Sequence, residues 1–206
     1  MPRYIETESR TETVVAAINE VLARDGIGGL SLRAIARESR VSTSSLLHHF
    51  GNREHLLRVA ASQTGRWRVR EIDRRCSRDG ALAFLPQDAD DVVDARAWLA
   101  WLELWRSEDN LATPIGGARR DERALLAEIF DYRLARDELD AAIALIDGLM
   151  TALCAPALPM PIARARAMLL AGIGSDAGSR ALRQPGAGGL DEVRNRSRRW
   201  RDRAEP

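Results

Sequence analysis

The stretch Ser31-Leu-Arg-Ala-Ile-Ala-Arg-Glu-Ser-Arg40-Val-Ser-Thr-Ser-Ser-Leu-Leu-His-His-Phe50-Gly-Asn-Arg-Glu-His55 decides the fold. Its pattern predicts a short helix, a tight turn, a second short helix and the start of a third. Ser31 is a residue type that caps helix N-termini, and Leu32 and Ile35 then fall on one inner face. Two short helices joined by a tight turn are typical of the helix-turn-helix, whose second helix enters the major groove of DNA.

The second short helix is expected to present a small polar face to its surroundings. Val41, Ser42 and Leu46 have the spacing of a hydrophobic staple with Ser42 as the N-cap. Leu46 and Phe50 are four residues apart, so both should face the core. The residues left on the outer face carry hydroxyl or imidazole groups, apart from one leucine: Thr43, Ser44, Ser45, Leu47, His48 and His49.

Residues 13–57 resemble the N-terminal domain of the tetracycline-repressor (TetR) family of bacterial transcription regulators. The resemblance rests on an amphipathic first helix and on strings that follow in the family's order: Leu32-Arg-Ala-Ile-Ala-Arg37, Val41-Ser-Thr43, His48-His-Phe50 and Asn52-Arg-Glu54. It implies a homodimeric DNA-binding regulator, a repressor that a small-molecule effector releases from a palindromic operator.

The same resemblance implies two kinds of contact with double-stranded DNA. Hydroxyl and imidazole side chains of the second helix are expected to reach base edges or the nearby backbone. Helix starts and arginines are expected to hold phosphates, which position a protein without specifying sequence. The residues predicted to contact DNA are Arg33, Ser42, Thr43, Ser44, Ser45, His48, His49 and Arg53.

Three positions depart from the family's pattern. Arg40 stands where the family usually has glycine, so a residue with a Cβ must take that turn position, under strain if its φ is positive. Leu47 stands where the family usually has a tyrosine that contacts phosphate, and a leucine cannot make that hydrogen bond. Arg53 stands where a lysine is usual and preserves its charge.

Composition excludes several other classes of protein. The chain has 206 residues, 45% of them hydrophobic, and a net charge of +1. It has no apolar run of roughly 18 residues and no signal-peptide pattern in residues 1–8, which look like a loose leader, so we expect a cytoplasmic protein. All three histidines lie in the helix-turn-helix segment, and Cys76 and Cys154 lack metal-ligand spacing. We expect no enzyme activity, cofactor or metal.

Hydrophobic residues recur at helical spacing along the rest of the chain, which predicts an all-α fold of about nine helices. We assign residues 1–55 to a three-helix DNA-binding domain and residues 56–175 to a helical domain for effector binding and dimerisation. Residues 176–206, rich in glycine and arginine, are predicted to be a mobile basic tail. Residues 113–117 should break the chain, and the arginines within residues 66–75 should form a solvated helix face.

A stripe of tryptophans in the second half has two interpretations. Trp98, Trp101 and Trp105 share one face of a predicted long helix, and core packing explains such a stripe. Alternatively it lines an effector pocket, because aromatic faces attract cationic groups. This half is similar to the TetR subgroup that contains the choline-responsive repressor of betaine synthesis. The residues considered for the pocket are Trp67, Trp98, Trp101, Trp105 and Phe130.

The resemblance also implies that the last two helices, from about residues 138 and 162, form a four-helix bundle with a second copy. Small residues in the last helix would allow close helix approach, although they also suit an ordinary core: Ala163, Ala165, Ala167, Ala171 and Gly172. The alternative function is a helical dimeric interaction module without sequence-specific DNA binding, which the departures at Arg40 and Leu47 would permit.

Overall fold

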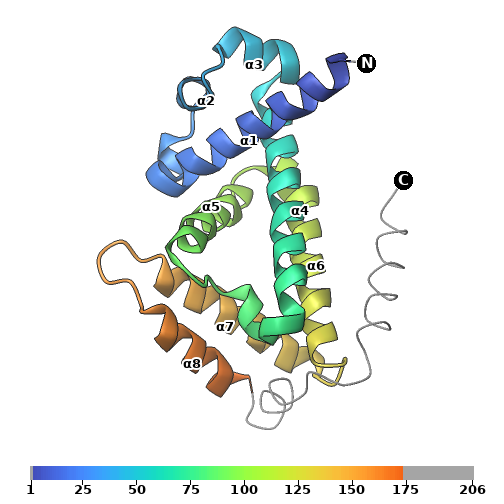
Figure 1. Cartoon of the computed structure of the whole chain (residues 1–206), viewed down its shortest axis with the longest axis vertical. Coiled ribbons are helices and arrows are strands. Elements are labelled where there is room, and N and C mark those ends of the chain that lie inside the picture. Colours follow the sequence, from blue (N-terminus) through green and yellow to red (C-terminus); the bar gives the residue numbers. More distant parts are fainter. Residues whose placement is uncertain (1, 174–206) are drawn as a thin grey trace.

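The structure, a computed structural model, describes the backbone of residues 2–173 and the side chains of residues 10–173. This part of the chain consists of helices without a β-strand, so the predicted all-α fold is confirmed. The predicted tail, 176–206, lies outside the described residues. The elements are α1 (Pro2–Gly29), α2 (Leu32–Ser39), α3 (Thr43–Phe50), α4 (Arg53–Asp79), η1 (Gly80–Phe84), α5 (Ala89–Trp105), η2 (Asp109–Leu111), α6 (Ala112–Ile129), α7 (Arg136–Leu153) and α8 (Ile162–Gly172) (Figure 1).

Helices α1, α2 and α3 gather at one end of the molecule, around the start of α4 (Figure 1). α1 supplies Val14 and Ile18, which are fully buried. α2 adds Ile35, and α3 adds Leu46 and Phe50, the residues that the sequence places on the inner faces of these helices. Their burial orients α3, so its remaining side chains point away from the core.

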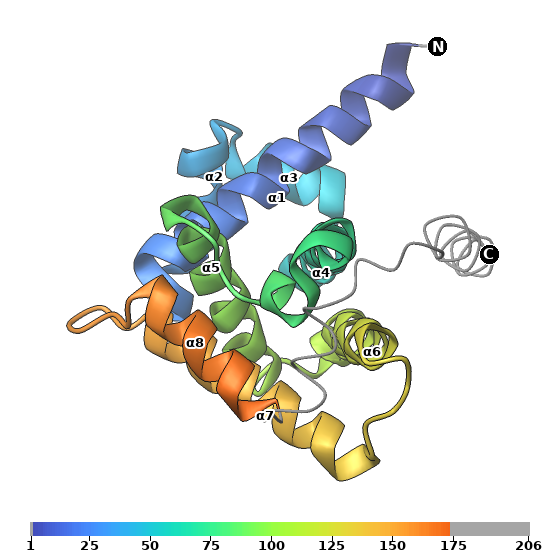
Figure 2. The same ribbon diagram turned by 60° about the horizontal axis from the view of Figure 1, so that its bottom comes forward.

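The long helix α4 joins this end to the rest of the molecule and runs beside α6 (Figures 1 and 2). The two helices come close at Gly65, where an added Cβ would lie 2.8 Å from the Cβ of Ala118. Trp101 of α5 donates its Nε1 hydrogen to Oδ1 of Asn19 on α1 at 2.8 Å. The Asn19 amide also bonds to Thr64 of α4, at 3.0 Å. These bonds fasten α1, α4 and α5 together.

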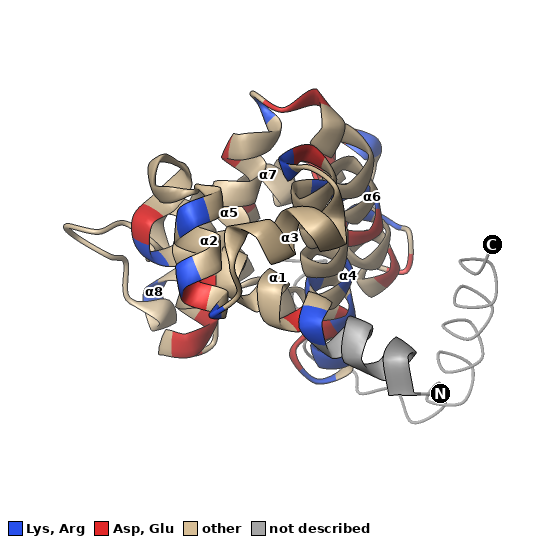
Figure 3. Ribbon diagram, turned by 90° about the horizontal axis from the view of Figure 1, so that it is seen from above, with Lys and Arg blue, Asp and Glu red and all other residues tan. Residues whose placement is uncertain are grey.

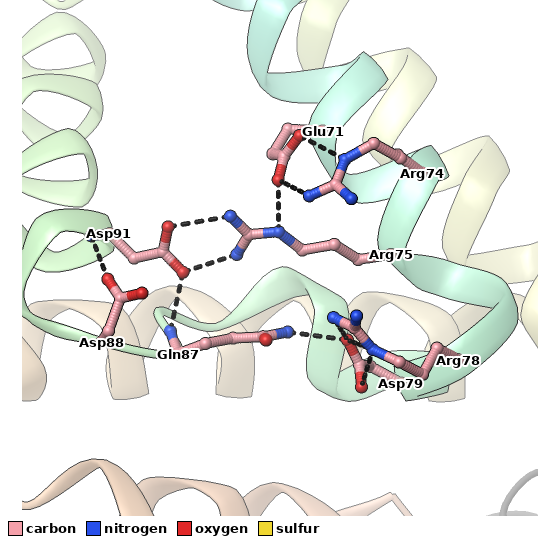
Figure 4. Close-up of polar contacts among 8 residues, drawn as sticks. All are labelled: Glu71, Arg74, Arg75, Arg78, Asp79, Gln87, Asp88 and Asp91. Atoms are coloured by element: carbon pink, nitrogen blue, oxygen red, sulfur yellow. Dashed lines mark hydrogen bonds and ion pairs between the residues drawn. The ribbon is translucent and has the colours of Figure 1, made fainter.

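A cluster of ion pairs fastens the second half of α4 to the start of α5 (Figure 4). Arg75 donates two hydrogen bonds to the Asp91 carboxylate, at 2.5 and 2.8 Å, and a third to Glu71 at 2.5 Å. Asp91 also accepts the backbone N–H of Gln87 at 2.9 Å. Hydrogen bonds from Arg74 and then Arg75 lower the pKa of Glu71 from 4.5 to about 2. The carboxylates therefore stay charged at neutral pH and hold the two helices.

Two of the expected interruptions are helical in the structure. Residues 2–8, predicted to be a leader, continue α1, where Pro2 fits because N–H groups of a first turn need no helical partner. Residues 113–117, predicted to break the chain, lie in the first turns of α6, and Pro114 is tolerated there for the same reason. In the part of the chain that the structure describes, no helix is long and apolar enough to cross a membrane.

Candidate nucleic-acid interface

The three helices of residues 32–79 each begin at a polar side chain that the sequence predicts as a cap. Such a side chain accepts a hydrogen bond from a backbone N–H three residues further on, which fixes where the helix starts. The cap at Ser42 thereby fixes Thr43 as the first residue of α3. The caps are Ser31 for α2 (to Ala34, 3.1 Å), Ser42 for α3 (to Ser45, 3.1 Å) and Asn52 for α4 (to His55, 2.7 Å).

α3 presents an uncharged polar face to its surroundings. Leu46 and Phe50 point inward and are 1% and 6% exposed. Of the other six residues, Thr43 is half-buried. The remaining five are exposed: Ser44, Ser45, Leu47, His48 and His49. Figure 3, which looks onto this end of the molecule, shows α3 without Lys, Arg, Asp or Glu. The structure thus brings six of the eight predicted DNA contacts, Ser42 included, to one helix and its cap.

The hydroxyl groups at the start of α3 are linked to one another. The Oγ atom of Ser42 lies 2.9 Å from the Oγ of Ser44 and donates to the Oγ of Ser45 at 2.9 Å. Because Ser42 also caps the helix, its hydroxyl is engaged within the chain. Ser44 and Ser45 keep further hydrogen-bonding capacity, since a hydroxyl has one donor and two acceptor positions.

The two histidines of α3 differ in their surroundings. Nε2 of His49 lies 3.1 Å from Oγ1 of Thr11 on α1, and its ring meets that of Phe50 edge-on, with 4.5 Å between centroids. His48 is exposed and makes no side-chain hydrogen bond within the described residues. His48 is therefore the imidazole with both ring nitrogens available, whereas His49 is oriented by α1.

The turn between α2 and α3 holds Arg40 in the left-handed region, with φ +55° and ψ +31°. A residue with a Cβ is about 1–2 kcal/mol less stable there than in the right-handed helical region. The backbone N–H of Arg40 nevertheless bonds to the carbonyl of Arg37 at 3.4 Å and closes α2. The strain expected for a positive φ at this position is present.

Three arginines beside α3 make no ion pair within the described part of the chain. Arg33 and Arg37 lie four residues apart on the exposed side of α2, and Arg40 is exposed in the turn. By contrast, Glu38 is held by Arg24 at 2.9 Å. Figure 3 shows the basic positions of α2 next to the uncharged α3. The sequence interpretation selected Arg33 and missed the other two, although the i, i+4 spacing of Arg33 and Arg37 was visible.

Arg53, the other predicted phosphate contact, has a partner inside the chain. Its Nη1 donates to Oε1 of Glu108, the residue before η2, at 2.7 Å. The two side chains are 39% and 24% exposed. Nδ2 of Asn110 in η2 donates to the backbone carbonyl of Glu54 at 3.0 Å. The connection between α5 and α6 therefore holds the first turn of α4, a contact that sequence reasoning did not anticipate.

A small open hollow, with a cavity volume of about 40 Å³, lies between α4, η1 and the start of α5. Of the residues considered for an effector pocket, Trp67 lines it and is 46% exposed. Asp94 also lines it and makes no ion pair within the described residues. Burial, followed by the nearby charges of Asp91 and Glu20, raises the pKa of Asp94. The hollow therefore combines an indole face with an unpaired carboxyl group.

The other aromatic residues considered for the pocket lie deeper. Trp98 and Trp101 are 1% and 0% exposed, Phe130 is buried and Trp105 is half-buried. The guanidinium carbon of Arg68 lies 5.4 Å from the centroid of a Trp98 ring, within cation–π range. In this structure Trp98 and Trp101 pack in the core, and their assignment to an effector pocket stays a prediction.

A buried chain of charges crosses the same region from α4 to α7. Arg68 donates to Glu122 at 2.5 Å, Glu122 accepts from Arg119 at 2.6 Å, and Arg119 donates to Asp147 at 2.6 Å. Glu122 is 3% exposed. The predicted solvated arginine face is therefore wrong for Arg68 and Arg75, whereas Arg66, Arg70 and Arg74 are exposed as predicted. The Arg68–Glu122 and Arg119–Asp147 pairs have no local pattern, because each joins two different helices. Arg119 and Glu122 have the i, i+3 spacing of one turn of α6.

The cysteines and histidines show no grouping that suggests metal chemistry. Cys76 and Cys154 are free and half-buried. Burial first, and then the charge of Asp73, raises the pKa of Cys76 to about 12. Within the described residues, no three His, Cys, Asp or Glu side chains are placed to hold a metal ion.

Comparison with known proteins points to one family. Residues 14–60 match the family described as "Bacterial regulatory proteins, tetR family". The HTH-type transcriptional regulator PksA of Bacillus subtilis is 26% identical over 165 residues, which are 72% of this chain and 80% of PksA. The HTH-type transcriptional regulator BetI of Vibrio parahaemolyticus is 28% identical over 141 residues, 63% of this chain and 69% of BetI.

Solved structures share the fold. A transcriptional regulator from Rhodococcus sp. Rha1 matches with a TM-score of 0.72 at 19% identity, over 80% of this chain and 94% of that chain. The multidrug binding protein EbrR, complexed with proflavin, matches with a TM-score of 0.56 at 20% identity, over 79% of this chain and 99% of EbrR. The fold of these regulators therefore extends well beyond the helix-turn-helix segment of this chain.

Proposed function

We propose that this chain, whose residues 14–60 match the TetR family, is a DNA-binding transcriptional regulator of that family, and that it is a repressor that a small-molecule effector releases from a palindromic operator. Residues 1–55 read DNA, and residues 56–175 bind the effector and a second copy of the chain. Cytoplasmic location and the absence of enzyme activity belong to the same proposal. The alternative, an interaction module without sequence-specific DNA binding, is not favoured because the named relatives are transcription regulators.

The observation that carries the proposal is the outward face of α3. This face is polar and uncharged, and unpaired arginines of α2 and the turn flank it, so one surface offers base-reading groups and phosphate-binding groups together. Ser42 contributes the N-terminal end of α3, whose free N–H groups suit a phosphate. The proposed contacts are Arg33, Ser42, Thr43, Ser44, Ser45, His48, His49 and Arg53, and we add Arg37 and Arg40 because both are exposed and make no ion pair within the described residues.

Dimerisation is proposed for the outer side of α7 and α8, which pack against each other at the end of the molecule far from α3 (Figures 1 and 2). Ala163, Ala167 and Ala171 are exposed on α8. Gly172 instead serves packing within the chain, because an added Cβ would lie 2.4 Å from Cδ2 of Leu145 on α7. A row of small exposed residues permits close helix approach in a symmetric interface.

The effector is proposed to enter the hollow beside Trp67. Solved EbrR holds proflavin, which supports a small organic ligand for a protein of this fold. The Asp94 carboxyl group, which makes no ion pair within the described residues, and the exposed indole of Trp67 both favour a positively charged group. Arg68 and Arg75 also line the hollow, but carboxylates hold both. Titration with tetramethylammonium chloride should change tryptophan emission, and Asp94→Asn should weaken the response. An unchanged emission for every organic cation tried would remove the hollow from the proposal.

Selection from a pool of random duplexes tests the central part of the proposal. The wild-type protein should enrich a two-fold symmetric sequence whose half-sites lie about one helical turn apart. Sedimentation should show a dimer, and Ala167→Glu should shift it to monomer, whereas Ala124→Glu on the exposed side of α6 should not. A pool that remains random after repeated selection would favour the interaction module instead.

A further inference from the structure

Two anionic groups can accept hydrogen bonds from Arg53. The proposed function requires its guanidinium group to meet a DNA phosphate at the start of α4. In the structure the same group donates to the carboxylate of Glu108 at 2.7 Å. A carboxylate and a phosphate oxygen accept the same N–H donors from arginine in the same planar geometry. Occupation by Glu108 therefore resembles, within the chain, the contact that DNA would make.

The Glu108 contact is supported by its surroundings and is not a chance meeting of two long side chains. Glu108 directly precedes η2, and Asn110 within η2 holds the backbone carbonyl of Glu54, the residue after Arg53. Two residues of the α5–α6 connection, one on each side of Asp109, thus contact two consecutive residues of α4. Leu111, fully buried, anchors the same connection in the core. This geometry sets Glu108 beside Arg53 in the absence of DNA.

We propose that Glu108 is an internal competitor of the DNA backbone for Arg53, and that the α5–α6 connection thereby lowers the affinity of the regulator for DNA. The inference rests on the proposed phosphate contact of Arg53. When the protein binds DNA, the Arg53–Glu108 ion pair must break or share its donor. The free energy lost from this ion pair offsets part of the free energy that Arg53 gains by contacting the phosphate. Glu108 acts without touching DNA, because its effect passes through Arg53.

The expected effect is modest because both side chains are partly exposed to solvent. Ion pairs of this kind change affinity by a factor of about two to five when one partner is neutralised. The sign separates the proposal from a structural role. If Glu108 merely held Arg53 in the orientation that phosphate requires, neutralising Glu108 would weaken DNA binding, whereas competition predicts that it tightens binding.

A four-protein cycle tests the competition: wild type, Glu108→Gln, Arg53→Gln and the double variant. Circular dichroism first checks that the four proteins have equal helix content. Fluorescence anisotropy then measures the affinity of each protein for the same fluorescein-labelled duplex, of arbitrary sequence, at moderate salt. Glu108→Gln should tighten binding about two- to fivefold in the wild-type background. In the Arg53→Gln background the same change should alter affinity by less than about 1.5-fold, because no guanidinium remains to be released.

Asp109→Asn is the matched control. Asp109 follows Glu108, is exposed, and makes no ion pair within the described residues, so its neutralisation removes the same charge from the same segment without releasing Arg53. Equal tightening by Asp109→Asn, or by Glu108→Gln in both backgrounds, would overturn competition in favour of general charge repulsion. Weaker binding of Glu108→Gln would also overturn it. If Arg53→Gln alone leaves affinity unchanged, the phosphate contact fails first.

Discussion

The helix-turn-helix end and the second half of this molecule use polar side chains in opposite ways. At α3 the hydroxyl and imidazole groups point outward, and Arg33, Arg37 and Arg40 have no partner within the described residues. In the other half, Arg68 and Arg119 are turned inward and satisfied by carboxylates. The difference indicates that the surface around α3 is available to an external partner, while the ion pairs of Arg68 and Arg119 stabilise the packing of helices within the chain.

The strongest way to test this contrast is to break the inward set. Glu122→Ala removes the shared acceptor of Arg68 and Arg119 and leaves two partly buried cations without it. The free energy of unfolding should fall by about 3–5 kcal/mol, as measured by urea denaturation. Asp140→Ala, which breaks the exposed Arg123–Asp140 pair, is the control and should cost less than about 1 kcal/mol. Similar losses for the two variants would show that the buried chain is not special.

Acid should weaken the ion-pair cluster between α4 and α5. The pKa of Glu71 is lowered to about 2 from 4.5 by Arg74 and Arg75. A carboxyl group with a depressed folded-state pKa stabilises the fold above its unfolded pKa, so this contribution is lost as pH falls from about 4.5 toward 2. Its size should be on the order of 1–2 kcal/mol, because solvent screens the group.

Chemical denaturation of wild type and Glu71→Gln across this pH range measures that contribution. The two proteins should differ at neutral pH and converge near pH 2. Asp94→Asn provides a contrast of opposite sign. Because burial raises the pKa of Asp94, its charged form opposes folding, and the variant should be the more stable protein at neutral pH. A constant difference between wild type and Glu71→Gln at all pH values would contradict the role given to the cluster.

The turn of the helix-turn-helix allows stability and DNA binding to be separated. Arg40→Gly should raise the free energy of unfolding by about 0.5–1 kcal/mol, since glycine removes the left-handed strain but gains freedom when unfolded. The same change removes a free cation beside α3, so DNA affinity should decrease. Arg40→Asn, which tolerates φ +55° and also removes the charge, should reproduce the loss of affinity with a smaller gain in stability. Lower stability of Arg40→Gly would contradict the strain.

An effect of similar size concerns Leu47, which is 40% exposed on α3. Leu47→Tyr should strengthen binding to any duplex by about fivefold, the value of about one hydrogen bond to phosphate. Leu47→Phe supplies the ring without the hydroxyl and should leave affinity nearly unchanged. Stability should change little in both variants, because the side chain faces away from the core. Equal gains for Tyr and Phe would point to apolar contact and not to a phosphate bond.

A contact can be predicted from the sequence when the residues that make it lie close together along the chain. Ser31, Ser42 and Asn52 act on backbone groups three residues away, so their roles as caps can be seen in a short window. The Arg68–Glu122 bond joins residues 54 apart, and the Trp101–Asn19 bond joins residues 82 apart. Neither pairing has a local signature.

The candidate site shows the same division within a few residues. The outer face of α3 follows from helical periodicity, because Leu46 and Phe50 are the residues that pack inward. Arg53 was assigned from its position at a helix start, but its partner Glu108 lies 55 residues further along the chain. Pro114 and Gly116 suggested a break because their propensities are local, whereas the first turn of α6 accommodates them.

The ratio of affinities for a selected duplex and for its scrambled version tests most directly whether the outward face of α3 reads DNA sequence. We expect the double change Ser44→Ala, His48→Ala to lower this ratio about tenfold or more, because base-edge contacts carry specificity. Arg33→Ala should weaken binding to both duplexes by the same factor and leave the ratio unchanged, because phosphate contacts carry no sequence information. A ratio that Ser44→Ala, His48→Ala leaves unchanged would contradict the assignment of sequence reading to α3.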